Sequence, residues 1–282
     1  MEEQERRHFS KLFASHIRRP EADLELDRAA LYLAGEEYPL LDVGAYQKQL
    51  DGLAAAVRDL STDPDPRSVI KALNYYLFDE LGFTGNVERY YSIDNNLLNR
   101  VLDTRTGMPV ALSVIYLELG RRLGVQCHGV GLPGNFLVKL DELGLYLDPF
   151  NQGQLVSAAD CRRMVRDSLG PHWSWRGDYL SPYSKKDILY RMLNNLKTVC
   201  LREKDYARAI EVLKKMALIS PSSPLTNRDL AWCYVNALQQ PTGMWHLQTY
   251  LHSSWPLSEV SEMQRQVESL WSAMIAVSQQ SG

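Results

Sequence analysis

Apolar residues recur every three or four positions through the first sixty residues, which predicts an α-helical N-terminal region. The apolar positions of its two helices are Leu24, Ala29, Leu31 and Leu33 in the first, and Tyr46, Leu50, Leu53 and Val57 in the second. The stretch GEEYPLLD separates these helices, and the turn cluster STDPDPRS at 61–68 ends the region. We expect a further helix over VIKALNYYLFDELG, then a structured loop and a short helix in FTGNVERYYSIDNNLLNRVLD.

The segment TGMPVALSVIYLELGRRLGV carries the strongest helical pattern in the chain. Pro109 suits its first turn, where a missing N–H has no helical partner to lose, and Gly124 suits its end. Strand-like alternation follows in VQCHGVGL and in the hairpin PGNFLVKLDELGLYLDPF at 133–150. A buried helix that leads into a small antiparallel sheet predicts an α+β core.

From about residue 179 the pattern is helical throughout. Two copies of a helical hairpin repeat of about 34 residues align when Pro221 closes the first copy. The aligned positions are Leu193, Leu196, Cys200, Ala209, Leu213 and Met216 in one copy, and Asn227, Leu230, Tyr234, Gly243, Leu247 and Tyr250 in the other. Lys197 and Asn227 depart from the usual pattern, so an ordinary helical bundle remains an alternative to two tetratricopeptide-like repeats.

The domain prediction follows from this change of pattern. We expect an α+β domain with an N-terminal helical region over 1–178, and an all-α repeat module over 179–282. Residues 257–277 are amphipathic and are expected to form a helix that caps the module.

Composition narrows the class of protein. The 282 residues carry 31 Lys and Arg against 34 Asp and Glu, a formal charge of −3, which gives no global argument for a nucleic-acid or acidic-membrane partner. No apolar run reaches the roughly 18 residues of a membrane-spanning helix, and the N-terminus MEEQERRHFSKLF lacks the apolar core of a secretory signal. We therefore expect a cytoplasmic protein. The four Cys and six His are scattered without metal-ligand spacing, so we expect reduced thiols, no metal and no cofactor.

Four motifs occur in series along the chain: LNYYLFDELGFTGNVERYYSIDNNLLNRVL, GMPVALSVIYLELGRRLGV, LPGNFLVKL and YLDPF. With these motifs the chain resembles the SirB-type family of bacterial proteins over roughly residues 20–250. The resemblance implies a transglutaminase-like domain with a papain-like core, followed by tetratricopeptide repeats.

The resemblance also implies where an active site would lie. In active relatives of the wider superfamily a Cys begins the buried helix, a His lies on the next strand, and an Asp lies on the strand after it. The helix N-terminus lowers the pKa of the thiol, the His acts as base, and the Asp orients the His. In this chain the three positions hold Pro109, Asn135 and Asp148. Because Pro109 has no nucleophile and Asn135 cannot exchange a proton near neutral pH, we expect a vestigial triad without thiol catalysis.

Replacement nucleophiles near this cleft are not expected to act. Ser113 lies one helical turn, about 6 Å, beyond Pro109, and is expected to bond a backbone carbonyl or to pack. Cys127 and His128 are neighbours on a predicted strand and point to opposite faces, so they cannot form a thiolate–imidazole pair without a bulge.

Other residues are candidates for lining or holding the cleft. Tyr90 and Tyr91, like Ser113 and His128, are candidate lining residues. Asp148 fits either a turn in which its carboxylate accepts backbone N–H bonds or a retained binding role. Asn135, which donates and accepts, is a candidate to bridge Asp148 to the backbone near the helix start.

Charge is uneven along the chain. Residues 184–215 hold nine Lys and Arg against four acidic residues, whereas residues 20–42 hold seven acidic residues against one Arg. A solvated helix face explains this, and so does a basic face that meets an acidic partner segment or the acidic N-terminal unit of the same protein. The candidate basic face comprises Lys185, Lys186, Arg202, Lys204, Lys214 and Lys215.

We therefore expect a non-catalytic scaffold or regulatory adaptor that binds a protein or peptide. The alternative is a hydrolase or acyl transferase that acts on a peptide or protein amide with residues outside the inherited triad. A weaker alternative is a regulator that binds nucleic acid through the basic repeat face; the few aromatic residues among those basic ones argue against it. Neither the partner nor the oligomeric state is predicted.

Overall fold

The computed structural model describes residues 2–61, 63–170, 172–237 and 240–251, together with three single positions near the C-terminus. The chain forms two compact units, Met1–Met192 and Leu193–Gly282. Their boundary falls inside one helix, α8 (Lys185–Arg202), whereas the sequence analysis placed a domain boundary at 178/179. The predicted capping helix at 257–277 lies outside the described residues, apart from three single positions.

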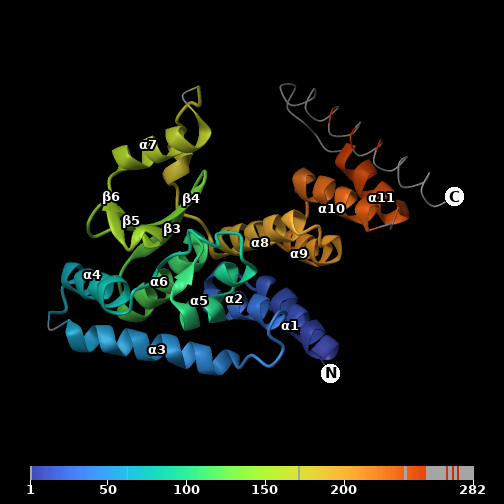
Figure 1. Ribbon diagram of the computed structural model, residues 1–282. Coiled ribbons are helices and arrows are strands. Elements are labelled where there is room, and N and C mark those ends of the chain that lie inside the picture. Colours follow the sequence, from blue (N-terminus) through green and yellow to red (C-terminus); the bar gives the residue numbers. More distant parts are fainter. Residues whose placement is uncertain are drawn as a thin grey trace. The chain divides into compact units, whose positions relative to one another are not determined.

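The first unit is rich in helices and contains a four-stranded sheet and a separate two-stranded pair, β1–β2, in agreement with the α+β prediction (Figure 1). Its helices are α1 (Glu2–Ile17), α2 (Leu26–Gly35), α3 (Val43–Leu60), α4 (Pro66–Asn74), α5 (Leu98–Thr104), α6 (Pro109–Leu123) and α7 (Ala158–Leu169). Its strands are β1 (Thr84–Gly85), β2 (Thr106–Gly107), β3 (Cys127–Leu132), β4 (Asn135–Leu140), β5 (Leu145–Asp148) and β6 (Gln154–Val156). Within the described part of the chain, every helix is too short or too polar to cross a bilayer.

Helix α6 lies at the centre of this unit. It contacts β3 and β4 on one side and α2, α3 and α5 on the other, so Figure 1 shows it between the sheet and the N-terminal helices. Pro109 is its first residue, and Gly124 ends it in the left-handed conformation with φ 76°, as predicted. Twelve successive residues from Pro109 to Gly120 are buried, which explains why the helix is apolar on more than one face.

The sheet has the strand order β3-β4-β5-β6 and is antiparallel throughout. Val138 pairs with Leu147 and Leu140 with Leu145, which confirms the hairpin predicted for 133–150. A further strand and a helix follow that the sequence analysis did not predict. The helix, α7, begins at a reciprocal capping box in which Ser157 and Asp160 bind each other's backbone N–H groups.

An arginine whose side chain is 10% exposed connects α6 to the N-terminal helices. Arg122 Nη2 binds Asp27 Oδ2 of α2 at 2.6 Å, Nη1 binds Glu118 Oε2 at 2.6 Å, and Nε binds Asp51 Oδ1 of α3 at 2.8 Å. Asp27 and Glu118 are only 1% and 3% exposed. Both carboxylates are therefore removed from water at the same point. The guanidinium of Arg122, with its rigid fork of N–H donors, offsets the desolvation cost of both.

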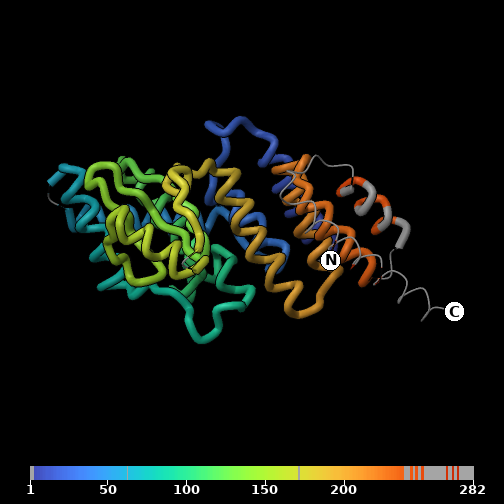
Figure 2. The backbone as a smooth tube through the Cα atoms, turned by 90° about the horizontal axis from the view of Figure 1, so that it is seen from above, coloured from blue at the N-terminus to red at the C-terminus, as the bar shows by residue number. Residues whose placement is uncertain are grey.

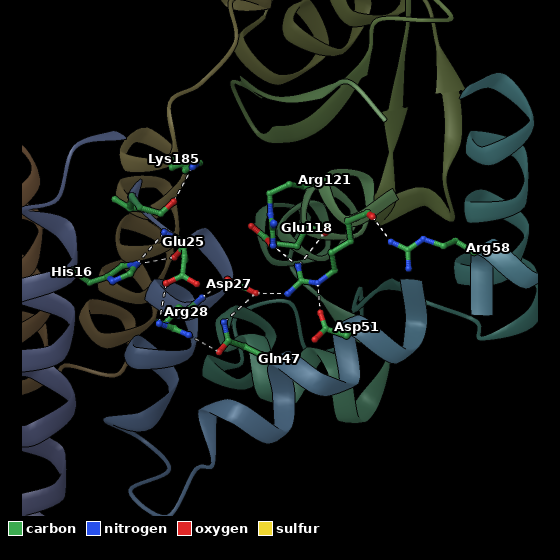
Figure 3. Close-up of polar contacts among 12 residues, drawn as sticks. His16, Glu25, Asp27, Arg28, Gln47, Asp51, Arg58, Glu118, Arg121 and Lys185 are labelled. Carbon is green, nitrogen blue, oxygen red and sulfur yellow. Dashed lines mark hydrogen bonds and ion pairs between the residues drawn. The ribbon is translucent and has the colours of Figure 1, made fainter. Parts of the chain in front are cut away.

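The same contacts extend to the surface on either side (Figure 3). Arg121 donates twice to Glu118, and Gln47 of α3 donates to Asp27 at 3.5 Å while accepting from Arg28 at 3.1 Å. The backbone carbonyl of Arg122 accepts from Arg58. Helices α2, α3 and α6 are thus held in register by charge as well as by apolar packing.

The second unit is entirely helical in its described residues. After α8 it contains α9 (Tyr206–Ile219), α10 (Pro224–Asn236) and α11 (Gln240–Leu251). Figure 2 shows α9 and α10 as successive orange coils. Helix α10 contacts both α9 and α11. Asp205 and Ser223 cap α9 and α10 by accepting backbone N–H bonds from Arg208 and Thr226.

Replacing Arg122 by Met should strongly destabilise the first unit. The change leaves Asp27 and Glu118 buried without their shared cation, and breaking a buried pair in this way costs about 3–5 kcal/mol. Urea unfolding followed by circular dichroism measures the effect. The control is Arg121→Met, because that side chain is 57% exposed and its loss should cost less than about 1 kcal/mol. Equal losses in the two variants would contradict the role given to Arg122.

His16 should make stability depend on pH. Its ring is buried, Nε2 accepts from the Glu25 N–H at 3.0 Å, and burial lowers its pKa below the ordinary 6.5. The nearby cations Arg19 and Arg28 lower it further, while the Glu25 contacts oppose the shift. Since the unfolded chain then binds the proton more tightly, the stabilising effect is complete above about pH 6.5 and is lost as pH falls below it.

The measurement is the urea midpoint from pH 7.5 to 5.5 for wild type, His16→Gln and the control His8→Gln on the exposed side of the same helix. We expect the urea midpoint to fall less between pH 7.5 and 5.5 in His16→Gln than in wild type, and to fall as in wild type in His8→Gln. Parallel curves for all three proteins would show that His16 does not titrate on unfolding.

Candidate functional site

The three positions of the expected triad lie where α6, β4 and β5 begin or end. Pro109 is the buried first residue of α6, Asn135 is the first residue of β4, and Asp148 is the last residue of β5. The hydroxyl of Ser113 connects the first two elements: its Oγ lies 2.8 Å from the Pro109 carbonyl and 3.4 Å from that of Phe136. The start of the helix and the start of the strand are therefore adjacent.

Asp148 is 3% exposed and its carboxylate is occupied by the turn that follows it. Oδ1 accepts from the backbone N–H groups of Phe150 at 3.0 Å and Asn151 at 3.3 Å. Oδ2 accepts from the Asn151 side chain at 2.8 Å. Pro149 begins the 3-10 turn Pro149–Asn151, so this is the Asx-type turn that the sequence analysis considered as one of two roles.

Asn135 makes a different and weaker contact. Its Nδ2 lies 3.5 Å from the Pro133 carbonyl, which is at the limit of hydrogen-bond distance. Among the described residues no hydrogen bond joins Asn135 to Asp148, so the bridge considered from the sequence does not form. The orienting contact that an active triad requires between its second and third members is thus absent from this part of the chain.

Ser113 is fully buried and donates to the carbonyl one helical turn earlier. This is the backbone-bonding role expected from the sequence. The described contacts of the Ser113 hydroxyl include no general base, and the hydroxyl has no access to solvent. It serves to join α6 to β4.

The two tyrosines have different positions. The Tyr90 ring packs edge-on against Phe150, with centroids 5.8 Å apart, and so covers the turn that Asp148 caps. Burial raises the pKa of its phenol, opposed by the positive charge of Arg191, so the phenol stays protonated at neutral pH. Tyr91 touches Tyr90 at 5.1 Å but is 45% exposed. Of the two, only Tyr90 packs against the turn beside the site.

Cys127 and His128 do not form a pair. Burial, with Glu142 and Asp141 nearby, raises the pKa of the Cys127 thiol to about 12. The His128 ring instead lies 2.9 Å from Asp141 Oδ2 at the surface. His128 lies opposite Lys139 in the sheet, four residues or roughly 13 Å along the strand from the Leu132–Asn135 pair. Contrary to its candidacy from the sequence, His128 does not line the site.

An asparagine that the sequence analysis did not single out holds the loop beside the helix start. Asn95 is 3% exposed, and its Nδ2 donates to the carbonyls of Arg89 at 2.6 Å and Tyr90 at 3.0 Å. The backbone carbonyl of Asn95 accepts a hydrogen bond from the backbone N–H of Met108, the residue before Pro109. The only signal in the sequence was the asparagine pair in the stretch IDNN, which two leucines follow directly.

The candidate basic face is not a continuous set of free cations. Lys185 Nζ donates to the carbonyls of Leu24 at 2.8 Å and Glu21 at 3.2 Å, so it binds the acidic N-terminal segment of the same unit (Figure 3). Lys215 is 4% exposed and donates to the Glu211 carbonyl, which removes it from the surface. The sequence could not show this because helical spacing alone does not tell which Lys is covered.

The remaining members of this set are placed as follows. Lys186 is half-buried at the start of α8 in the first unit. In the second unit Arg202 and Lys204 are exposed at the turn between α8 and α9, and Lys214 is paired with Glu211 at 2.7 Å. Arg202 and Lys204 are exposed side chains that lie two residues apart.

No group of three His, Cys, Asp or Glu side chains in the described residues is arranged to hold a metal ion. Around Pro109, Asn135 and Asp148, the described side chains provide a buried hydroxyl, an amide and an occupied carboxylate. Such groups can position a backbone, but they include no nucleophile with a base within reach.

Comparison with known proteins agrees with this fold. The family model of the transglutaminase-like superfamily matches residues 44–194. A UPF0162 protein of Xylella fastidiosa strain 9a5c is 36% identical over 221 residues, 75% of this chain and 78% of that protein. A UPF0162 protein of Vibrio cholerae is 31% identical over 173 residues, 60% of this chain and 64% of that protein.

A more distant similarity reaches a larger protein. Human F-box only protein 21 is 32% identical over 145 residues, which are 48% of this chain but only 22% of that protein. No solved structure matches the chain. The matches confirm the transglutaminase-like part of the resemblance, and the chain belongs to the transglutaminase-like superfamily, among the UPF0162 proteins.

Proposed function

We propose that this protein is a non-catalytic member of its superfamily that acts as a protein-binding scaffold or regulatory adaptor. The position that begins the buried helix holds Pro109, and the strand position holds Asn135. Acyl transfer through a thiol needs a nucleophile and a base at these two places, and neither side chain supplies one.

The observation that carries the proposal is the state of Asp148. Its two oxygens accept three hydrogen bonds from Phe150 and Asn151, all within the turn that it caps. A carboxylate used in this way stabilises the fold without orienting a histidine. The third triad position has therefore taken a structural role that explains why an Asp stands there in the absence of its partners.

The proposed binding module is the helical second unit, which we interpret as tetratricopeptide-like. The six aligned positions of the first copy are all buried, and in the second copy Leu230, Tyr234 and Tyr250 are buried as well. Gly243 aligns with Ala209 and is closely approached: a Cβ there would lie 3.0 Å from Val235 and 3.3 Å from the Ala231 carbonyl. Small residues at these two positions suit the close crossing of paired helices.

The two departures from the repeat pattern have structural partners. Lys197 Nζ binds Asp229 Oδ2 at 2.7 Å, which connects α8 to α10. Asn227 Oδ1 lies 3.0 Å from His246 Nδ1, which connects α10 to α11, and the His246 ring stacks on Tyr234 at 5.4 Å. Polar pairs thus take the place of apolar contacts, and the helical hairpin interpretation is supported.

Helical repeats bind extended or helical peptides on the surface that stacked hairpins create, and the exposed pair Arg202 and Lys204 suits an acidic partner. The similarity to F-box only protein 21 also supports use of this domain alongside other segments, because it covers only 22% of that longer protein. We infer that the chain acts in the cytoplasm without a cofactor.

The proposal predicts no acyl-transfer activity. Full-length protein incubated with casein and a fluorescent primary amine should incorporate no more label than heat-denatured protein does, and should release no peptide fragments. The reason is the absence of a nucleophile–base pair. Incorporation that Ser113→Ala or Asp148→Asn abolishes while circular dichroism shows a folded chain would overturn the non-catalytic proposal.

Binding requires a separate test. A partner captured by the full chain from its source cell, then purified, should bind wild type with one-to-one saturation and lose at least fivefold in affinity for Arg202→Glu/Lys204→Glu. The matched control is Lys11→Glu/Arg18→Glu, two exposed residues of the N-terminal region. Equal affinities of the partner for both variants would refute the basic pair as a binding determinant. If no partner binds the wild-type protein saturably, the scaffold proposal is refuted.

Cys127 should be inert in the native protein. With a pKa of about 12, only about one thiol in ten thousand is ionised at pH 8, so alkylation by iodoacetamide should be at least about 100-fold slower than in urea. Peptide mapping by mass spectrometry measures the rate at this residue. Native labelling as fast as in urea would show that the thiol is accessible and ionised, and would revive the enzyme alternative.

A further inference from the structure

A pocket of about 480 Å³ lies in the first unit, at a place that the triad region and the repeat module do not use. Residues of α1, of the connection between α2 and α3, of α3 and of α5 line it. Among them are Glu5, Tyr38, Leu40, Tyr46, Asn99 and Asp103. This volume lies within the range of pockets that hold a small ligand or one or two side chains of a partner.

The lining has an excess of negative charge. Three carboxylates, those of Glu5, Glu37 and Asp103, face one guanidinium, that of Arg100, which leaves two negative charges. Arg100 is itself held in place: it lies 5.6 Å above the Tyr38 ring and 3.5 Å from both Asp94 and Asp103. An anionic ligand would be repelled here, whereas a cation would be attracted.

Several acceptors of the lining lack a hydrogen-bond partner, and so does one donor, Arg100 Nε. Asn99 is 3% exposed, and its Oδ1 has no hydrogen-bond partner. Among the described residues Glu5 has neither a hydrogen bond nor an ion pair, and both contacts of Asp103, from the Tyr46 hydroxyl and from Arg100, use Oδ2. A buried acceptor that is left unpaired costs free energy, so a ligand rich in N–H donors would be stabilised in this pocket.

The pocket also has an apolar component. Leu40 is 92% exposed, the most exposed of the large apolar residues of the described chain, and it stands beside Pro39 and Leu41 in the lining. A single exposed leucine is ordinary, but here it adjoins a concave, acidic site. An apolar group beside the cationic group of a ligand would cover the Leu40 side chain.

We infer that this pocket binds a peptide segment of a partner protein that presents an arginine next to an apolar residue. The guanidinium supplies up to five N–H donors for Asn99, Glu5 and Asp103, and the apolar neighbour packs on Leu40. The inference rests on the proposal that the protein acts by binding other proteins, and it names a second surface and a different partner chemistry from the acidic segment proposed for Arg202 and Lys204.

The probe is a pair of fluorescein-labelled peptides with acetylated N-termini and amidated C-termini, one with the core Ala-Leu-Arg-Leu-Ala and one with the core Ala-Leu-Glu-Leu-Ala. Fluorescence polarisation is measured with the full chain at low salt, and the peptides are recovered afterwards and examined by chromatography. We expect the Arg peptide to bind with a dissociation constant below about 1 mM, and at least tenfold more tightly than the Glu peptide.

Two matched pairs of variants locate the binding. Glu5→Gln should weaken binding of the Arg peptide at least threefold, whereas Glu3→Gln, two residues away and paired only with the exposed Arg7, should not change it. Leu40→Ser should weaken it similarly, whereas Leu60→Ser, at an exposed leucine outside the pocket, should not. Each of these side chains is at least partly exposed, so the variants should fold.

The outcomes separate the two proposals. Equal binding of both peptides, absence of binding up to 5 mM, or equal losses within each matched pair would overturn the pocket assignment and leave the non-catalytic proposal untouched. Tight binding of the Arg peptide followed by its cleavage would support the pocket and refute the non-catalytic proposal.

Discussion

The first unit depends on one buried guanidinium. Arg122 is the shared partner of Asp27 and Glu118, two carboxylates with almost no exposed surface, and it reaches Asp51 as well. Taking two anions out of water is costly unless a cation with suitable donors meets them, so the fold is most stable when α2, α3 and α6 meet at this point. An apolar interface would tolerate small shifts of one helix along another, whereas this interface fixes the position of α6 relative to α2 and α3.

That constraint positions the elements that carry Pro109, Asn135 and Asp148. Because α6 is fixed near its C-terminal end by Arg122, its N-terminal end is presented to β4, where Ser113 bridges the carbonyls of Pro109 and Phe136. Asn95 fixes the preceding loop to Met108, and Tyr90 covers the turn that Asp148 caps. A helix start therefore lies beside two strand ends, and the Asp148 side chain at one of them stabilises the backbone of its own turn. This arrangement supports the proposed binding role, because a fold alone does not determine a function.

Local signals in the sequence predicted much of this fold. Pro109 and Gly124 marked the bounds of α6, and alternation at Phe136, Val138 and Leu140 predicted the hairpin, because caps and strand periodicity act between near neighbours. The contacts that hold α2 and α6 together act over longer distances in the chain: Arg122 and Asp27 are 95 residues apart. Spacing also could not reveal that Lys215 is buried, that Lys185 binds the segment after α1, or that His128 lies at the far end of the β3–β4 pair from Asn135. The pocket beside Leu40 could not be predicted for the same reason, because residues of α1, α3 and α5, far apart in the sequence, line it.

The proposed non-catalytic role requires that the Asp148 carboxylate is committed to its own turn. Hydrogen exchange of the Phe150 and Asn151 backbone amides, followed residue by residue by NMR in wild type and in Asp148→Asn and Asp148→Ala, measures whether it is. We predict that both amides are protected in wild type, partly protected in Asp148→Asn, which keeps one acceptor oxygen, and exposed to exchange in Asp148→Ala, while the amides of β4 remain protected in all three. Rapid exchange of both amides in the wild-type protein would contradict the account, because the carboxylate would then be available to another group.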